Sequence, residues 1–381
     1  MEKYKTLYEL FNEALSHFPN NKARVYESID DFITNDKKAA EFINTINYGD
    51  SDLFKEDNIN NSIISQGRAR HAVISLFLGM VLGKLKGLFK NYISILNVDS
   101  VDYIQFADTY IVYKLWMLTA INHDYGYHTN YIHKKIDIDD LPISYNLFDD
   151  NIHYDYEPLI NYKEKYPEVL KNTYDQIKEY YNYAHRFHEH CGDEEKNDHG
   201  ILGALLLYDR ISKKNNKELR KSKLSYHYMN NNFEYKDMLF YKTACLTIAQ
   251  HNIFKSNSEG RDKCYGEALS HLYHNANYFV DEKHKLLYLL SLVDTVECIK
   301  TFSKSESSSD YFHTLTVLKN VELLVTEDEI VIDFGKLYDK IKKDKEELLP
   351  VLESHIDGIM RLNMWTSFKV TRKDNTKVII K

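Results

Sequence analysis

Apolar residues recur at intervals of three and four through several long stretches of this 381-residue chain. That spacing places them on one face of an α-helix and predicts helices that pack inward. Only five prolines and 13 glycines interrupt the chain, and 43% of its residues are hydrophobic, which is ample for a large core. The sequence therefore predicts a mainly α protein with one main domain and additions to it.

Five segments carry the helical pattern most clearly. They comprise residues 62–90, 103–123, 199–211, 237–251 and 282–302. The first two are strongly apolar, and we expect both to be central. Asp198 and Asp237 stand at the starts of the next two, where an aspartate can accept hydrogen bonds from the first backbone N–H groups of a helix. Together these segments predict a helical domain spanning residues 61–305.

The remaining segments predict three additions to this domain. Residues 1–60 are expected to form a helical N-terminal extension. The polar residues at about 129–197, which hold three of the five prolines, predict a helical insertion. Residues 312–381 predict a small C-terminal α+β domain. In it VELLVTEDEIVIDF and FKVTRKDNTKVIIK have the alternation of strand hairpins, and they flank a helical segment that Pro350 divides.

Charge and cysteine usage narrow the classes of partner. The net charge is −8 with acidic and basic residues interspersed, so no bulk electrostatic attraction to nucleic acid or to a membrane is expected. The longest apolar run, AVISLFLGMVLG, is too short to span a bilayer, and the first residues lack a signal-peptide core. Four scattered cysteines suit a reducing compartment. We expect a cytoplasmic protein, with a homo-oligomer left open.

Six residues of metal-ligand types, four histidines and two aspartates, stand in or beside the apolar helices. His71 lies near the start of the first helix, and the pair His123 and Asp124 closes the second. His199 opens the third, His251 closes the fourth, and Asp294 falls in the middle of the fifth. Buried carboxylates are costly without compensation, and a metal cation is a common remedy. Imidazole and carboxylate ligands suit Zn, Mn or Fe, and six of them fit two ions better than one.

The order H…HD…H…H…D resembles the HD-domain superfamily of metal-dependent phosphohydrolases, in particular its binuclear branch, which includes the HD-GYP phosphodiesterases. The resemblance covers residues 62–305 and implies an HD-domain helical core. It also implies two divalent ions, of Fe, Mn or Zn, with Mg or Ni open, and a hydroxide shared by both ions that attacks a phosphate ester or phosphodiester. The implied ligands are His71, His123 and Asp294 for one ion, His199 and His251 for the other, and Asp124 as the bridge.

Two departures from the family pattern bear on the substrate. The segment HDYGY has Tyr127 where many members carry a lysine, so a phosphate contact common in those members is absent or supplied elsewhere. The segment after His251, QHNIFKSNSEGRDK, lacks the GYP signature, and this disfavours a cyclic di-GMP phosphodiesterase. We expect a small phosphorylated substrate, of the nucleotide or cyclic-nucleotide class.

Further residues are predicted to act beside the metal ligands. Asp124 and His128 are the expected catalytic residues, and Arg70, Lys255 and Arg261 are the expected cations for a substrate phosphate. A second histidine cluster, HRFHEHC at 185–191, lies in a polar stretch that favours a solvated loop over a metal site. Two other functions stay open: a di-iron oxygenase that uses the same ligands, and a nucleotide-binding or regulatory protein with a structural metal site.

Overall fold

The computed structural model describes two compact units of the chain. The first combines residues 1–90, 279–281 and 288–381, and the second combines 91–278 and 282–287. The described residues are 4–18, 21–46, 68–85, 116–128, 285–303, 311–326, 328–365 and 369–381, with single positions within 199–207 and 244–251. Helices predominate in them beside one small sheet, which confirms the mainly α class. The HD-domain core and the predicted domain boundaries stay predictions.

The N-terminal helices of the first unit pack around an aromatic core. Helix α1 (Leu7–Ser16) begins at Thr6 with a capping box, in which Thr6 accepts from the backbone of Glu9 and the Glu9 carboxylate accepts from the backbone of Thr6. Helices α2 (Asp36–Ile46) and α5 (Ala69–Leu85) both follow, with short 3-10 turns η1 (Asn21–Val25) and η2 (Ile29–Asp31) before α2. Rings from α1, α2, α5 and the turns that follow α1 and η2 meet in one cluster: Phe11, Phe18, Phe32, Phe42 and Phe77. Helix α5 confirms the central part of the predicted helix 62–90.

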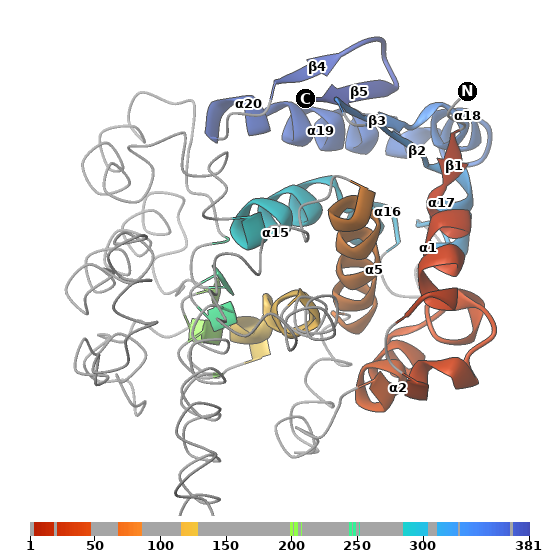
Figure 1. The fold of residues 1–381 in the computed structure, drawn as a ribbon. Helices are drawn as coiled ribbons and strands as arrows, with labels where there is room; N and C mark the ends of the chain where they lie inside the picture. The colour runs from red at the N-terminus through yellow and green to blue at the C-terminus, as the bar shows by residue number, and fades with distance from the viewer. Residues whose placement is uncertain are drawn as a thin grey trace, which may run out of the picture. The chain divides into compact units, whose positions relative to one another are not determined.

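A five-stranded antiparallel sheet closes the C-terminal part of this unit, in the order β1-β2-β3-β5-β4. Its strands are β1 (Lys5–Thr6), β2 (Glu322–Val325), β3 (Ile330–Asp333), β4 (Val370–Arg372) and β5 (Lys377–Ile380). The pairs β2–β3 and β4–β5 confirm both predicted hairpins. Strand β1 was not predicted, because two residues are too few to show an alternating pattern. Figure 1 shows this strand from the chain's start beside strands from its end.

Helices α17 to α20 accompany the sheet. They are α17 (Thr314–Asn320), α18 (Gly335–Asp344), the 3-10 turn η8 (Glu346–Leu348), α19 (Leu349–Met360) and α20 (Leu362–Trp365). Strand β3 buries Ile330, Val331 and Ile332, and β5 buries alternate residues, Val378 and Ile380. Leu352 and Ile356 of α19 are buried as well. Pro350 lies in the first turn of α19, where its missing N–H costs no helical hydrogen bond. The predicted division of the helical segment is confirmed at this place.

The predicted helix 282–302 is divided in two, which corrects the expectation. Helix α15 (Lys285–Val296) ends, and α16 (Ile299–Phe302) begins after Glu297 and Cys298. The Glu297 carboxylate accepts hydrogen bonds from the backbone N–H groups of Ile299 at 2.6 Å and Lys300 at 3.1 Å. A side chain that accepts hydrogen bonds from the first N–H groups of a helix stabilises the start of that helix. Asp294 therefore lies in the last turn of α15, not in its middle.

Arg70 ties four segments of the first unit together. Its Nε donates to the Asp36 carboxylate at 3.0 Å, and its Nη1 donates to the hydroxyls of Ser303 at 3.1 Å and Thr314 at 2.9 Å. The Arg70 side chain is only 5% exposed, so its charge is compensated within the fold. These contacts join the start of α2, the start of α5, the end of α16 and the start of α17.

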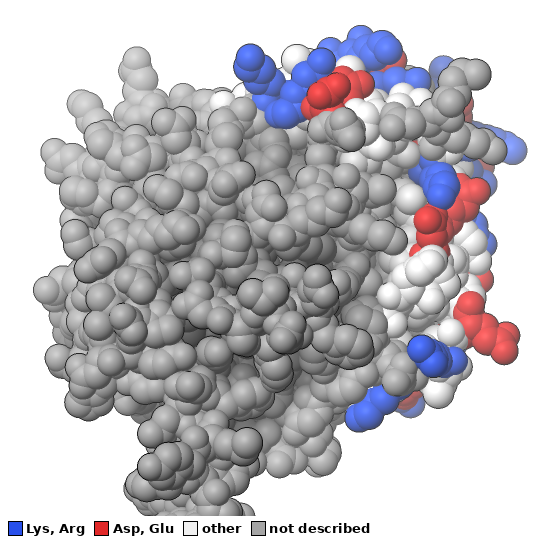
Figure 2. Space-filling model, viewed as in Figure 1, with Lys and Arg blue, Asp and Glu red and all other residues white. Residues whose placement is uncertain are grey.

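The described surface carries no large region of one charge on the face drawn in Figure 2. Blue basic and red acidic side chains alternate over the coloured residues, as the interspersed charges of the sequence predict. Within the part of the chain that the structure describes, no helix has both the length and the apolar character needed to cross a bilayer.

The second unit is described at the segments that carry predicted ligands. Residues 116–122 are helical, which confirms the end of the predicted helix 103–123, and Trp116 is fully buried. A turn at His123 and Asp124 leads into the 3-10 helix η3 (Tyr125–His128). Described positions from 199 to 207 and from 244 to 248 are helical, and His251 follows the latter.

His355 of α19 is held neutral where the C-terminal helices meet α16. Its Nδ1 lies 3.4 Å from the Thr301 hydroxyl, and its ring contacts Phe302 and Phe334 edge-on. Its Nε2 is shut off from solvent and has no hydrogen-bond partner in the described structure. Burial lowers the pKa of His355 to about 4. A proton can enter this position only at the expense of the packed state.

Stability should therefore fall as the pH drops from about 6.5 to about 4. In this window the unfolded chain binds a proton at His355 and the folded chain does not, so acid favours unfolding by up to about 3 kcal/mol from this residue. We expect His355→Leu to reduce the loss of unfolding free energy between pH 7 and pH 4.5, measured by urea denaturation. The exposed His17→Leu serves as control. Equal losses in wild type and His355→Leu would contradict the assignment.

Candidate metal centre

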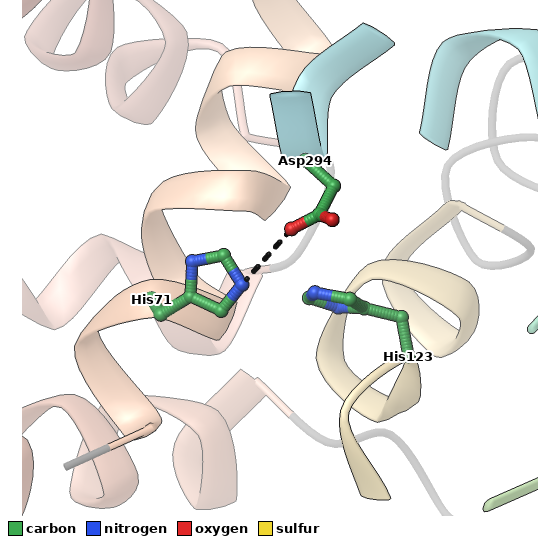
Figure 3. A group of neighbouring side chains, drawn as sticks. All are labelled: His71, His123 and Asp294. Atoms are coloured by element: carbon green, nitrogen blue, oxygen red, sulfur yellow. Dashed lines mark ion pairs between the residues drawn. The ribbon is translucent and has the colours of Figure 1, made fainter. Parts of the chain in front are cut away.

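His71 and Asp294 form a pair of candidate metal ligands in the first unit. His71 lies in the first turn of α5, and its Nε2 is 3.4 Å from the Asp294 Oδ1 at the end of α15. Figure 3 draws this ion pair as a dashed line, with the imidazole edge turned toward the carboxylate. The figure also labels His123, which belongs to the second unit and is described there. The His71 side chain is 3% exposed and that of Asp294 is 29% exposed, so solvent reaches the pair on the carboxylate side.

Glu297 fixes the orientation of His71. Its Oε2 lies 3.0 Å from the His71 Nδ1, and its side chain has no exposed surface. Since a carboxylate accepts the hydrogen bond, Nδ1 carries the proton and Nε2 is the nitrogen that faces Asp294. A histidine that donates one nitrogen to a carboxylate and offers the other is the usual arrangement of a metal-ligating histidine. Glu297 was not predicted from the sequence.

The pKa values of His71 and Glu297 are both shifted from their usual values. Burial opposes a charge on His71, but hydrogen bonds to Asp294 and Glu297 outweigh it and raise the pKa of His71 to about 9. Burial likewise opposes ionisation of Glu297, yet the hydrogen bond from His71 and the nearby charges of His71 and Lys300 hold the pKa of Glu297 below its usual value. The site thus places two carboxylates around one imidazole, and that concentration of negative charge favours a cation.

In the second unit, hydrogen bonds to backbone carbonyls orient two imidazoles. The His123 Nδ1 donates to the carbonyl of Ala120 at 2.7 Å, and the His251 Nδ1 donates to the carbonyl of Ile248 at 2.6 Å. A carbonyl can only accept, so both Nδ1 atoms carry a proton and Nε2 is the nitrogen of each ring that can offer a lone pair. These two rings are buried, and they meet edge to face with centroids 5.3 Å apart.

His199 and Asp124 complete a group of ligand atoms with His251. The His199 Nε2 lies 3.3 Å from the His251 Nε2 and 3.3 Å from the Asp124 Oδ1. The same carboxylate oxygen is 3.8 Å from the His123 Nε2. A single proton on His199 can serve either His251 or Asp124, whereas a divalent ion accepts lone pairs from all of them at once. Histidine nitrogens and a carboxylate oxygen are also the donors that Zn, Fe and Mn prefer.

Glycines allow the segments of this second group to approach one another. A Cβ on Gly126 would collide with the backbone carbonyl of His199, and one on Gly203 would lie 2.8 Å from the Gly126 nitrogen. A Cβ on Gly200 would lie 2.7 Å from the Ile248 carbonyl oxygen and 3.0 Å from the His251 Nδ1. These glycines therefore let the turn after Asp124, the helix at His199 and the segment before His251 meet backbone to backbone. The close approach of the His199 carbonyl therefore requires a glycine at position 126, two residues after Asp124.

Tyr127 packs on a ligand of the second group. Its ring is stacked on His199 with centroids 3.9 Å apart and an angle of 21° between the planes. The residue after Gly126 thus supports the imidazole from one side, and it offers no cation for a phosphate.

Two groups of side chains could therefore hold a metal ion. One includes His71 and Asp294, and the other consists of Asp124, His199 and His251, with one ligand atom from each member within 4.8 Å of the others. The structure describes all six predicted ligand residues.

Of the residues predicted to act on the substrate beside Asp124, the structure describes the side chain of Arg70 alone. Arg70 is buried and bound to Asp36, Ser303 and Thr314, so its contacts explain its place in the fold. Lys255, Arg261 and the cluster at 185–191 lie outside the described residues, and so does the side chain of His128. Two residues near the ligands were missed, Glu297 and Lys300. Their spacing of three and six residues from Asp294 was the only signal for them.

Replacing Gly126 by alanine should disrupt the second group. The added methyl would overlap the His199 carbonyl, and overpacking of this kind commonly costs about 1–3 kcal/mol or more. We expect Gly126→Ala to lower the urea midpoint and to lose bound Mn, measured by elemental analysis after dialysis. Gly358→Ala in α19 is the matched control, because nothing lies within 4 Å of its added Cβ. A Gly126→Ala variant with the stability and metal content of wild type would contradict the close approach.

Replacing Glu297 by glutamine should weaken metal binding at His71. The amide keeps the shape but removes the charge that holds the Nδ1 proton, and changes to such partners typically cost about 10–100-fold in metal affinity. Glu353→Gln, which breaks the ion pair of a partly exposed glutamate with Arg372, is the control. Competition with a fluorescent chelator measures the affinity. Equal affinities in wild type and Glu297→Gln would contradict the orienting role.

Comparisons with protein-family models, curated proteins and solved structures found no match to this chain. Membership of the HD-domain superfamily accordingly stays a prediction from the order of the six histidines and aspartates in the sequence.

Proposed function

We propose that this chain is a metal-dependent phosphohydrolase that acts on a small phosphate ester or phosphodiester, of the nucleotide or cyclic-nucleotide class. One observation supports it above all others. The Nε2 atoms of His199 and His251 lie 3.3 Å apart beside the Asp124 carboxylate, with the His251 ring fixed by the Ile248 carbonyl. Lone pairs that converge in this way in a buried place call for a cation.

The ligand residues divide between two ions. His199 and His251 would hold one ion, and His71 and Asp294 would hold the other. The resemblance to the HD-domain superfamily alone implies that His123 belongs with His71 and Asp294 and that both ions share Asp124. Fe, Mn and Zn suit these donors best, and Mg or Ni would be the weaker choices.

Each side chain has a task that follows from its contacts. Bound divalent ions supply a water of lowered pKa and neutralise phosphoryl oxygens. Glu297 keeps the proton on the His71 Nδ1, so Nε2 is the atom that binds. The carbonyls of Ala120 and Ile248 do the same for His123 and His251. His128 is retained as the proposed group for proton transfer, because it follows Asp124 within one short turn.

Metal content and hydrolysis should be lost together when Asp124 is removed. We expect wild type to bind two Mn ions per chain, Asp124→Ala to lose most of them, and hydrolysis of bis(p-nitrophenyl) phosphate and of nucleotides to fall to background. A double variant, His199→Ala with His251→Ala, should keep the fold and lose about half the metal. Asp344→Ala, an exposed aspartate paired with Lys340, is the control. Elemental analysis and initial rates measure both quantities.

Other outcomes would select another function. Turnover retained by Asp124→Ala would refute the mechanism, and an unchanged metal count in the double variant would refute the second ion. Product that forms only with oxygen and iron would favour the di-iron oxygenase. A nucleotide that raises the melting temperature with every metal and is never consumed would favour a binding protein.

A further inference from the structure

Lys300 stands at the solvent-facing side of the His71–Asp294 pair. Its Nζ donates to the Asp294 Oδ1 at 2.6 Å and to the Asp294 backbone carbonyl at 2.8 Å. The Lys300 side chain is 37% exposed and Asp294 is 29% exposed, whereas Glu297 has no exposed surface. One side of the pair is therefore closed by protein, and the side that solvent reaches is lined by an ammonium group.

The same carboxylate that orients His71 also fixes the backbone of Lys300. The Glu297 Oε2 accepts from the His71 Nδ1 at 3.0 Å and from the Lys300 backbone N–H at 3.1 Å. The same Glu297 oxygen thus fixes both the backbone from which the Lys300 side chain starts and the orientation of the His71 ring. The four-carbon stem of Lys300 stays rotatable, so Nζ can move between the Asp294 carboxylate and another anion without a change of the backbone.

We propose that Lys300 forms the anion-binding part of this site and contacts a phosphoryl oxygen of the substrate. This inference rests on the proposed function and names the cation that it needs. An ion bound by Asp294 would compete with Lys300 for the Oδ1 atom, and Lys300 would then supply a second positive charge near that carboxylate. A tetrahedral oxyanion arriving from the solvent-facing side meets two positive charges, and a lysine ammonium binds such an anion as a point charge.

A simpler role would explain the same contacts. Lys300 bonds to a backbone carbonyl in the last turn of α15, where a positive charge stabilises the end of a helix. That role predicts lower stability when Lys300 is replaced, with no effect on anion binding. The two explanations therefore separate once stability and phosphate affinity are measured on the same variants.

The test uses the full chain loaded with Mn and inorganic phosphate as the probe. Calorimetry measures the phosphate affinity, elemental analysis the metal content, and urea denaturation the stability. We expect Lys300→Met to keep the metal and to bind phosphate at least tenfold more weakly, and Lys300→Arg to stay within about threefold of wild type because it keeps the charge. Lys336→Met is the control, since Lys336 also pairs with a carboxylate, that of Glu322 at 2.8 Å, but lies in α18.

Each contrary result overturns the inference in a distinguishable way. Phosphate affinity unchanged in Lys300→Met, with stability lowered, would assign the residue to the helix end alone. Loss of metal from Lys300→Met and Lys300→Arg alike would make Lys300 a support for Asp294. Wild type that binds Mn but no phosphate would refute the anion site and leave the metal centre standing. Wild type that binds no Mn would refute the proposed function as well.

Discussion

The buried carboxylate of Glu297 is the group on which the geometry of the His71–Asp294 pair depends. It accepts from one imidazole nitrogen and from two backbone N–H groups, so three hydrogen bonds converge on a side chain without exposed surface. Charge-assisted hydrogen bonds of this kind offset the cost of burying the charge, and a carboxylate with full partners is rigid. A rigid Glu297 carboxylate fixes the orientation of the His71 ring and also the position of the first residues of α16.

The break between α15 and α16 allows the Glu297 carboxylate to contact both His71 and the first N–H groups of α16. If the helix continued, Glu297 would point along the surface of a regular helix and its backbone neighbours would bond to carbonyls four residues back. Because the helix ends at Val296, Asp294 lies in an open last turn and Lys300 lies close to its carboxylate. The break between the helices therefore produces a buried side, where Glu297 orients the His71 imidazole, and a partly exposed side, where Lys300 contacts Asp294.

The sequence predicts the framework better than it predicts these details. Apolar periodicity sufficed for α5, for the helix before His123 and for both hairpins, since each depends on a pattern of several residues. It could not predict the break at Glu297, because glutamate is a good helix former and the apolar face continues through Ile299 and Phe302. A glutamate that caps a new helix looks in the sequence like any exposed glutamate. The role of Gly126 was equally hidden, since it depends on the backbone of a residue far along the chain.

The C-terminal part of the first unit supports this geometry through α16. Arg70 bonds to Ser303 just after α16 and to Thr314 at the start of α17, and His355 of α19 contacts Thr301 and Phe302. A four-residue helix has too few internal hydrogen bonds to hold its own position, so its place is set by these neighbours. The sheet buries the inner residues of the hairpins against α19, which in turn packs on α16. The small C-terminal α+β part thus fixes the position of α16, the helix that carries Lys300 and follows Glu297.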